Sequence, residues 1–395
     1  MNFLNKQEVI EFLKIDEKTF DVLKSDSFLI GKDFDGIEKY DLNDVHRFTF
    51  SKYNKNKKTI SVLVPCHNEE MGLRGCIDSL LNQTRLPDQI LVVNDGSTDK
   101  SGEILASYGD KIQVLTIPVA TGNKSYAQER GLKEISSDIF FASDGDTILE
   151  PQAIEEVEKS FNEDLDVVAV GGYIKSIPYN WITACRELDY IIGQNLHKLA
   201  QANMGAMFVI PGCAGAFKTN VFRKMIKFEH DTLTEDLDFT YKFHKNFLKI
   251  SYNTKIIAWT QDPGTLRQYI NQMRRWYCGG WQNLRKHYTV ISKPNNSIQL
   301  SLTYFEGVIF SIALFLFPII NITFFLYFLI PYIFFLLLLG LYGAILRKRL
   351  DLLYYAPTYS ILIFINSYIF IEQFIKEVIL KSNNLTWFHP DRRNN

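Results

Sequence analysis

The chain has 395 residues, of which 47% are hydrophobic, and its 43 basic and 44 acidic residues give a net charge of −1. This length allows two or three domains, and the apolar content excludes an intrinsically disordered chain. The five cysteines have neither paired nor metal-type spacing, so we expect free thiols in a reducing compartment.

Residues 1–50 are expected to form a small helical domain. Helix-like patterns cover 7–13 and 41–48, and Thr19 is placed to cap or begin another helix. The order of these elements resembles the helix-turn-helix of excisionase and MerR-type regulators. DNA binding depends on phosphate neutralisation, however, and this segment has seven Lys or Arg against eleven Asp or Glu. We therefore expect it to dock a protein or regulate the chain, with DNA binding unlikely.

A basic linker over 51–58 follows, and its lysines either lie against lipid head groups or form a solvated tether. From residue 59 to 262, short β-branched runs alternate with amphipathic stretches, which is typical of an α/β domain with a mainly parallel sheet. Its candidate strands are 60–64, 89–93, 112–117, 139–142 and 167–170, and its candidate helices are 73–81, 100–108, 124–135 and 152–161.

Polar clusters follow three of these strands. They are residues 65–70, 94–97 and 144–146. Ligands of parallel sheets bind beyond the carboxyl ends of the strands, so we expect the three clusters to line one cleft. The first cluster has no G-x-G-x-x-G pattern, which argues against a dinucleotide-dependent oxidoreductase.

Asp144 and Asp146 stand one residue apart at a strand end. Two such carboxylates can bind a divalent metal, because Mg²⁺ and Mn²⁺ take oxygen ligands and bridge carboxylates to substrate phosphates. Asp146 is the expected direct ligand, and Asp144 is the second metal residue. A calcium loop would need a longer run of alternating acids.

Two further motifs follow, Thr234-Glu235-Asp236 and Gln272-Met273-Arg274-Arg275-Trp276. With Asp144-Gly145-Asp146, their order resembles the membrane-bound polysaccharide synthases of glycosyltransferase family 2, which include chitin, hyaluronan, cellulose and poly-N-acetylglucosamine synthases. The resemblance covers residues 59–290 in detail. It implies a GT-A-like fold that binds a nucleotide sugar.

The same resemblance implies roles for residues of the strand ends. Asp95 would contact the base or ribose of the nucleotide, and Glu70 would be a further nucleotide contact. Lys124 would add positive charge nearby, although the family usually has Gly where this chain has Asn123. Asp144 would reach the metal through water or bind the ribose.

Asp236 is the expected general base, because transfer with inversion needs a carboxylate that removes the proton of the acceptor hydroxyl. Glu235 would support the catalytic site without contacting the substrate itself. Thr234 to Asp236 also open a helix-like stretch, where a cap and acids in the first turn are a structural explanation. Their place between the metal pair and the later motif favours catalysis.

The segment 263–300 is expected to hold a basic amphipathic helix over 265–287 that lies flat on the membrane surface. Gln272 and Arg275 share one face of this helix. Arg275 is placed to meet the departing diphosphate, and Trp276 offers a flat apolar surface to the acceptor sugar. Membrane anchoring is the alternative role for the arginine and the tryptophan.

Residues 301–380 are expected to be transmembrane. No Asp, Glu, Lys, Arg or His occurs from Gly307 to Leu346, a stretch about twice as long as one bilayer-spanning helix needs. A hairpin is therefore expected, with Arg347 to Arg349 at its cytoplasmic end. A third span over 359–375 stays open, because Glu372 and Lys376 lie near its end.

The N-terminus is polar and has no signal-peptide pattern, so the catalytic domain is expected on the cytoplasmic side of an inner or plasma membrane. The tail over 381–395 is expected to be cytoplasmic too. It contains residues 387–392, which resemble the Trp-to-Arg tail of many family members. With three spans, however, the tail would lie outside, and the sequence leaves this conflict open.

Taken together, the sequence predicts a membrane-embedded inverting glycosyltransferase that uses a UDP-sugar with Mg²⁺ or Mn²⁺ and extends a β-linked polysaccharide. Transfer of one or a few sugars to a lipid acceptor, giving a glycolipid, keeps the same site residues and stays open. A non-catalytic membrane sensor that binds sugar nucleotides is the alternative of another class. Binding alone needs no general base, which argues against the sensor.

Overall fold

The computed structural model describes residues 3–13, 17, 20–21, 24, 31–34, 36–41, 58–292, 302–382 and 385. The chain divides into two compact units, residues 1–58 with 158–167 and residues 59–157 with 168–395. Several predictions fall outside the described residues. They are Thr19, residues 42–48 of the helix expected over 41–48, the linker from 51 to 57 and the tail motif over 387–392. Asp41, where that helix was expected to begin, belongs to a β-strand.

The first unit contains a sheet that the sequence analysis did not predict. α1 (Lys6–Leu13) is the expected first helix. β1 (Phe3–Leu4), β2 (Lys32–Phe34) and β3 (Ile37–Asp41) form an antiparallel sheet in the order β1-β3-β2. Gly36 makes the turn between β2 and β3 with a φ of +81°, a value that favours glycine. A purely helical domain is therefore wrong, and the helix-turn-helix is not confirmed.

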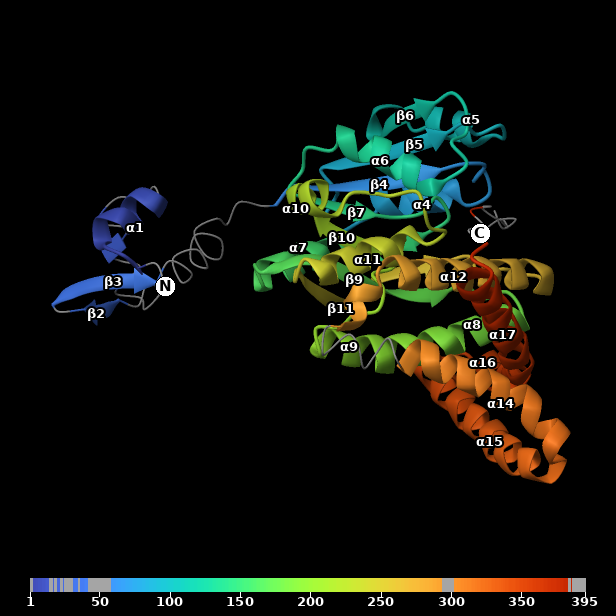
Figure 1. Ribbon diagram of the computed structural model, residues 1–395. Helices are drawn as coiled ribbons and strands as arrows, with labels where there is room; N and C mark the ends of the chain where they lie inside the picture. Colours follow the sequence, from blue (N-terminus) through green and yellow to red (C-terminus); the bar gives the residue numbers. More distant parts are fainter. Residues whose placement is uncertain are drawn as a thin grey trace. The chain divides into compact units, whose positions relative to one another are not determined.

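The second unit is built on an eight-stranded sheet in the order β6-β5-β4-β7-β10-β9-β11-β8 (Figure 1). The first four are parallel neighbours and match predicted strands: β4 (Ile60–Cys66), β5 (Gln89–Asp95), β6 (Gln113–Ile117) and β7 (Ile139–Ala142). β10 (Gly215–Lys218) pairs antiparallel with β7 and with β9 (Val167–Ser176). β11 (Lys249–Thr260) pairs antiparallel with β8 (Ile148–Leu149), and these two strands were not predicted.

The helices of the α/β part include the predicted crossovers, α4 (Leu73–Leu81), α5 (Ser101–Ala106), α6 (Lys124–Glu134) and α7 (Ala153–Glu163). α11 (Glu235–Lys245) packs on the sheet through Phe239 and Phe243. Both rings contact Phe217 of β10, with centroids 5.1 and 5.8 Å apart. Buried aromatic side chains contribute most to such packing. This contact therefore fixes where α11 begins, next to the ends of the strands.

α12 (Leu266–Lys286) holds the start of α11 at close range. A Cβ atom at Gly279 would come within 2.4 Å of the Thr234 hydroxyl, so only glycine allows this approach. Asn283 donates from its amide nitrogen to the carbonyl and to the hydroxyl of Thr234, each at 3.0 Å. The predicted amphipathic helix is thus packed on the residue that precedes Glu235.

α8 (Trp181–Ile192) is the other long helix on this side of the sheet. Its N-terminus is closed by a capping box, in which the Asn180 side chain accepts the Thr183 N–H and the Thr183 hydroxyl accepts the Asn180 N–H. Short helices α9 (Leu199–Asn203) and α10 (Thr219–Val221) follow in the chain.

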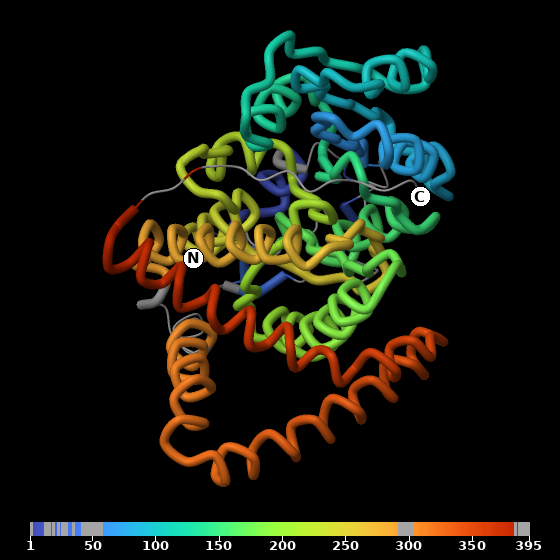
Figure 2. The backbone as a smooth tube through the Cα atoms, turned by 90° about the vertical axis from the view of Figure 1, so that its right-hand side faces the viewer, coloured from blue at the N-terminus to red at the C-terminus, as the bar shows by residue number. Residues whose placement is uncertain are grey.

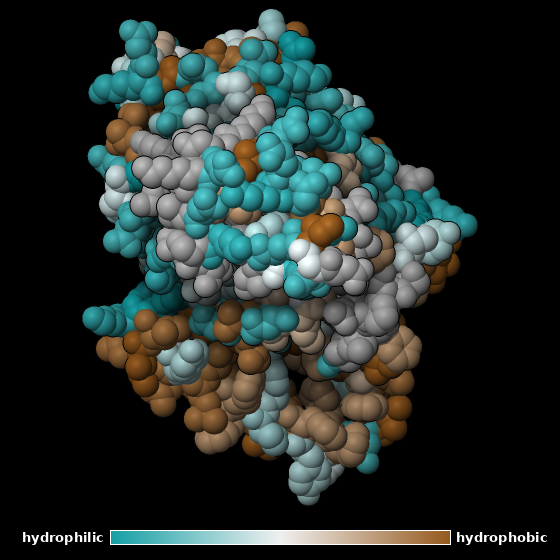
Figure 3. Space-filling model, turned by 90° about the vertical axis from the view of Figure 1, so that its left-hand side faces the viewer, coloured by the Kyte–Doolittle hydropathy of each residue, from teal (hydrophilic) through white to brown (hydrophobic). Residues whose placement is uncertain are grey.

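Three helical stretches are long and apolar enough to cross a membrane, namely Thr303–Ile320, Ile322–Arg347 and Asp351–Ile379. α14 (Gly307–Ile320) and α15 (Ile322–Arg347) form the expected hairpin, with Asn321 capping α15 through the N–H of Phe324. Hydrophobic surface gathers at the lower end of the face in Figure 3, and hydrophilic surface covers most of its upper part.

The hairpin returns to the α/β part. Arg347 at the end of α15 pairs with Glu187 of α8 at 2.5 Å and donates to the Tyr173 hydroxyl at 2.5 Å. Gly343 of α15 lies against Leu188 of α8. The C-terminal end of α15 is therefore attached to α8.

The third apolar stretch contains α16 (Asp351–Tyr355) and α17 (Tyr359–Phe374), and α17 runs along α8 and α12 (Figure 2). Tyr359 donates a hydrogen bond to Asp189 of α8 at the start of α17. Near its end, Glu372 pairs with Arg274 of α12 at 3.0 Å. Leu362 and Ile369 pack between these points in one cluster with side chains of α8 and α12. Both ends of α17 are thus attached to helices of the α/β part.

Candidate active site

The three polar strand ends line one cleft of about 580 Å³. In the parallel register, Cys66 of β4 stands opposite Asn94 of β5, and Leu63 of β4 stands opposite Ala142 of β7. This register brings the following loops to one edge of the sheet. The side of the cleft across from them comes from α8, α11 and α12.

Of the ten site residues that the sequence predicts, all except Glu70 line this cleft. The nine are Asp95, Lys124, Asp144, Asp146, Glu235, Asp236, Gln272, Arg275 and Trp276.

Glu70 is turned toward α5. Its carboxylate accepts the N–H of Lys100 at 3.0 Å, at the start of that helix, where an anion is stabilised. Glu69 lines the cleft in its place. The structure therefore gives Glu70 a capping contact, and a direct role with the nucleotide is not supported by its position.

Asp95 fixes the loop that closes one end of the cleft. Its two carboxylate oxygens accept the N–H of Thr121 at 3.0 Å and the Thr121 hydroxyl at 2.6 Å. Gly96, with a φ of +59°, lets this loop approach, because a Cβ there would come within 2.2 Å of the nitrogen of Ala120. The loop therefore needs glycine at position 96 as much as it needs the aspartate.

Asp144 and Asp146, the predicted metal residues, lie in the segment that follows β7. Both line the cleft, and Asp146 is 2% exposed. A Cβ at Gly72 would meet the Cα of Asp146 at 3.0 Å, so the start of α4 packs directly behind this residue. Carboxylate oxygens are the donors that Mg²⁺ and Mn²⁺ prefer, and the residues present fit such an ion.

Lys124 joins the two sides of the cleft. Its ammonium lies 2.6 Å from an oxygen of Asp144 and 3.0 Å from an oxygen of Glu235. Burial lowers the pKa of Lys124, but these two carboxylates outweigh burial and raise it above its ordinary value. Asn123, the unexpected residue in the sequence motif, is the cap of α6 and accepts the N–H of Ser125. The lysine is therefore a charged bridge at the start of a capped helix.

Asp236 occupies the first turn of α11 and accepts the N–H of Leu237 at 2.9 Å. Burial raises the pKa of Asp236 to about 6, and Glu235 adds to this rise, while Lys124 and Arg275 oppose it. A carboxylate with this pKa is mostly ionised at neutral pH and is still basic enough to accept a proton. The geometry and the charge of Asp236 both suit a general base.

Gln272, Arg275 and Trp276 come from one face of α12 and reach the cleft together. Thr265 caps this helix by accepting the N–H of Gln268. The buried side-chain oxygen of Gln272 has no hydrogen-bond partner among the described residues. Such an atom is costly without a partner, so it is available for a substrate hydroxyl.

The cleft also contains residues that the sequence analysis did not select. They include Glu69, Asp189, Tyr190, Lys198 and Asp262. Two of these, Asp189 and Tyr190, lie three and four residues after Arg186, on one face of the otherwise largely apolar helix α8. This cluster of polar residues on an apolar helix is the sequence pattern that could have identified Asp189 and Tyr190 as cleft residues.

Lys198 has no hydrogen bond or ion pair to any residue that the structure describes. Burial lowers the pKa of Lys198 to about 8, while Cys213 and Asp236 oppose this shift. It is therefore a further cation near Asp236, in addition to Lys124 and Arg275.

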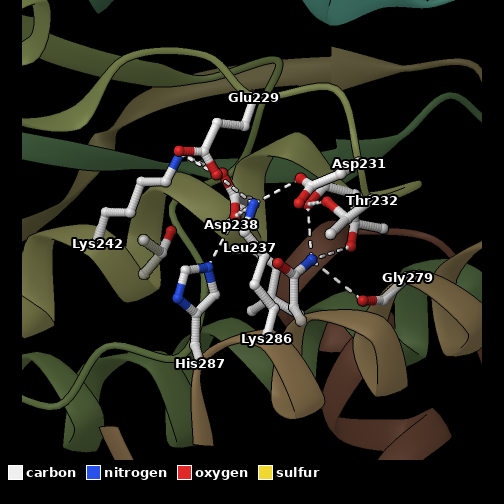
Figure 4. A network of polar contacts seen from close by, with 12 residues as sticks. Glu229, Asp231, Thr232, Leu237, Asp238, Lys242, Gly279, Lys286 and His287 are labelled. Atoms are coloured by element: carbon white, nitrogen blue, oxygen red, sulfur yellow. Dashed lines mark hydrogen bonds and ion pairs between the residues drawn. The ribbon is translucent and has the colours of Figure 1, made fainter. Parts of the chain in front are cut away.

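A separate acidic group lies outside the cleft (Figure 4). Oxygens of Glu229, Asp231 and Asp238 come within 4.8 Å of one another. Two ammonium groups compensate them, because Lys242 and Lys286 each lie 2.7 Å from Asp238. The pair between Asp238 and Lys286 joins α11 to the end of α12, so this acidic group fastens the two helices together.

Comparisons with known proteins agree with this architecture. The model of the family "Glycosyl transferase family 2" matches residues 61–225. The probable glycosyltransferase YdaM of Bacillus subtilis is 27% identical over 296 residues, which cover 69% of this chain and 70% of YdaM. A poly-beta-1,6-N-acetyl-D-glucosamine synthase of Staphylococcus epidermidis is 26% identical over 265 residues, which cover 63% of this chain but only 61% of the synthase.

Among solved structures, the mannosyltransferase PcManGT from Pyrobaculum calidifontis, in complex with GDP-Man and Mn²⁺, is similar with a TM-score of 0.56. It is 16% identical, and the match covers 78% of this chain and 87% of PcManGT. At this identity the likeness concerns the fold. It confirms the expected GT-A-like architecture.

Replacing Lys124 with Met should destabilise the protein, because two carboxylates would lose their common counter-ion inside the cleft. The expected loss is about 3 kcal/mol in the free energy of unfolding, measured by denaturant titration in detergent. Lys133→Met is the matched control, since Lys133 lies in the same helix and pairs with Glu129 at the surface, with the two side chains 60% and 40% exposed. Equal effects of the two substitutions would contradict the bridging role of Lys124.

Proposed function

Because the chain is a family 2 glycosyltransferase, we propose that it is a membrane-embedded inverting enzyme that transfers sugar from a UDP-sugar to a growing β-linked polysaccharide. The observation that carries this proposal is the composition of the cleft. It combines a metal-type carboxylate pair, the half-buried carboxylate of Asp236 and the Gln272 to Trp276 helix face in one cavity. The helix that supplies this face also packs against α17 of the apolar region.

The proposed reaction divides between the two sides of the cleft. Asp95 would contact the nucleotide, and Asp144 and Asp146 would hold Mg²⁺ or Mn²⁺, whose positive charge would neutralise the leaving diphosphate. Arg275 donates to the same diphosphate as the bond to the sugar breaks. On the other side, Asp236 takes the proton of the acceptor hydroxyl while Trp276 supports the acceptor ring. Lys124 pairs with both Asp144 and Glu235, which keeps the donor side and the acceptor side of the cleft at a fixed separation.

The donor and acceptor are tested with membranes that contain the full chain. We propose N-acetylglucosamine as the first sugar to test, because the relatives named above include poly-beta-1,6-N-acetyl-D-glucosamine synthases. A panel of radiolabelled UDP-sugars, with GDP-mannose for comparison, identifies the donor. Product length then separates a polymer synthase from an enzyme that adds one sugar to a membrane lipid. Absence of transfer from every nucleotide sugar would contradict the proposal.

Residues 1–50 are proposed to dock a protein partner or to regulate the enzyme. Their net charge of −4, from seven basic and eleven acidic residues, would repel DNA phosphates.

Asp236→Asn should lower the rate of transfer by about 100-fold or more, because the amide cannot accept the proton. In the wild-type enzyme, the rate should fall as the pH drops below about 6, since the base must be ionised and its pKa is raised to about 6. The measurement is the pH profile of transfer at saturating donor. The residual activity of Asp236→Asn should lack this acid limb, and its binding of UDP should stay near the wild-type value.

Metal dependence provides a second test. EDTA should abolish transfer, and Mn²⁺ or Mg²⁺ should restore it. Asp146→Asn should raise the Mn²⁺ concentration for half-maximal activity by about tenfold, because a direct ligand loses its charge. Glu70→Gln is the control carboxylate, since Glu70 faces α5 and does not line the cleft. Full activity in metal-free buffer would contradict the metal assignment.

The attachment of α17 to α8 and α12 supports a membrane arrangement with two crossings, by α14 and α15, and a surface position for α17. In that arrangement the catalytic domain and residue 381 share the cytoplasmic side. Phe247, Lys381 and the hairpin tip at Ile320 are all exposed. A membrane-impermeant maleimide should label Phe247→Cys and Lys381→Cys from one side of the membrane and Ile320→Cys from the other. Labelling of Lys381→Cys together with Ile320→Cys would show three crossings.

A further inference from the structure

Arg186 of α8 is buried directly behind the cleft, with 4% of its surface exposed. All three of its guanidinium nitrogens are used. One donates to Asp189 at 2.9 Å, one to Asp262 at 3.3 Å, and the third to the hydroxyl of Tyr190 at 3.3 Å. The Tyr190 hydroxyl in turn donates to Asp262 at 3.1 Å. The guanidinium plane is therefore held from several directions by groups that lie on α8 and at the end of β11.

The held guanidinium lies against the ring of Trp276. Its central carbon is 4.8 Å from the centroid of the indole and 4.9 Å from the ring of Tyr190. A cation at this distance is attracted to an aromatic ring, and the attraction is strongest for Trp and in buried surroundings. Trp276 lines the cleft and Arg186 does not. The arginine thus packs behind the ring, and the tryptophan presents its remaining surface to the substrate.

We propose that Arg186 is a positioning residue for the acceptor sugar, acting through Trp276. This inference rests on the proposed function, in which the acceptor ring stacks on the indole. Contact between a sugar ring and an indole requires the aromatic plane to stay at one tilt. A guanidinium fixed by two carboxylates provides a flat, immobile support for that plane. Lysine would keep the charge near Asp189 and Asp262 but offer no plane for the indole to stack on.

A purely structural role for Arg186 predicts something different. If the arginine only neutralised Asp189 and Asp262, its replacement would weaken the packing of α8 and affect donor and acceptor alike. Arg347 is the control for this possibility. It also fastens α8, through Glu187, but among the described residues its side chain interacts with Glu187 and Tyr173 and not with Trp276.

The test compares Arg186→Lys with Arg347→Lys in membranes, using UDP-N-acetylglucosamine as donor and a short N-acetylglucosamine oligosaccharide as acceptor. Arg186→Lys should raise the KM for the oligosaccharide about tenfold, the loss expected from a buried cation–π contact. The KM for the donor and the rate of donor hydrolysis in the absence of acceptor should stay within about twofold. Arg347→Lys should leave the acceptor KM unchanged. An acceptor KM within twofold of wild type for Arg186→Lys would overturn the proposal.

A double-mutant cycle shows whether the effect passes through the indole. In a Trp276→Leu background, adding Arg186→Lys should change the acceptor KM no further, because the ring that Arg186 supports is gone. A further rise of the same size would show that Arg186 acts on its own, and the proposal would be wrong. If Arg186→Lys is not recovered in membranes, Asp189→Asn loosens one of the two carboxylate anchors and should raise the acceptor KM alone.

A measurement that needs no turnover separates this inference from the proposed function. Arg186→Lys should increase acrylamide quenching of tryptophan fluorescence in detergent, and the increase should vanish when Trp276 is also replaced by Leu. Unchanged quenching would contradict the positioning of Trp276 even if transfer occurs. Changed quenching without any sugar transfer would support the positioning and contradict the proposed reaction.

Discussion

Carboxylates from three separate segments meet in one cleft, and their mutual repulsion is the constraint on which the rest of the site depends. Asp95, Asp144 and Asp146 come from strand ends, and Glu235 and Asp236 come from the start of α11. Lys124 offsets part of this charge with one ammonium that contacts both Asp144 and Glu235. These two ion pairs connect the loop after β7 to the start of α11. They therefore balance charge in the cleft and also hold two parts of the fold together.

α12 connects the cleft to the apolar helices. It touches Thr234 through Gly279 and Asn283, which sets the start of α11. The same helix pairs with α17 through Arg274, and it carries Gln272, Arg275 and Trp276 into the cleft. A single helix therefore holds the start of α11, carries the proposed acceptor surface and packs against a helix of the apolar region. A polymer made in this cleft would leave it close to the bilayer, which fits the proposed function.

Two carboxylates of α11, those of Asp236 and Asp238, have different roles. Glu235 and Asp236 in its first turn line the cleft, where burial raises the pKa of Asp236 to about 6. Asp238 lies in the same turn but outside the cleft. Burial disfavours its ionised form, but contacts with His287, Lys242 and Lys286 hold its pKa well below its ordinary value. The first carboxylate keeps basicity that a general base needs, while the second stays ionised and fastens α11 to α12. Their different partners, rather than their residue type, separate these roles.

The sequence by itself determined the parallel strands, the apolar hairpin and nine of the ten predicted cleft residues, because strand periodicity, uncharged length and short motifs are local signals. Only the tertiary structure decided the rest. Glu70 and Glu69 are neighbours in the chain, and the packing of α5 decides that Glu69 faces the cleft. β8 and β11 form through a pairing between distant segments, and Gly36 turns the expected helical region into a hairpin. Arg186 meets Trp276 across 90 positions of the chain, and such a contact leaves no periodic pattern in the sequence.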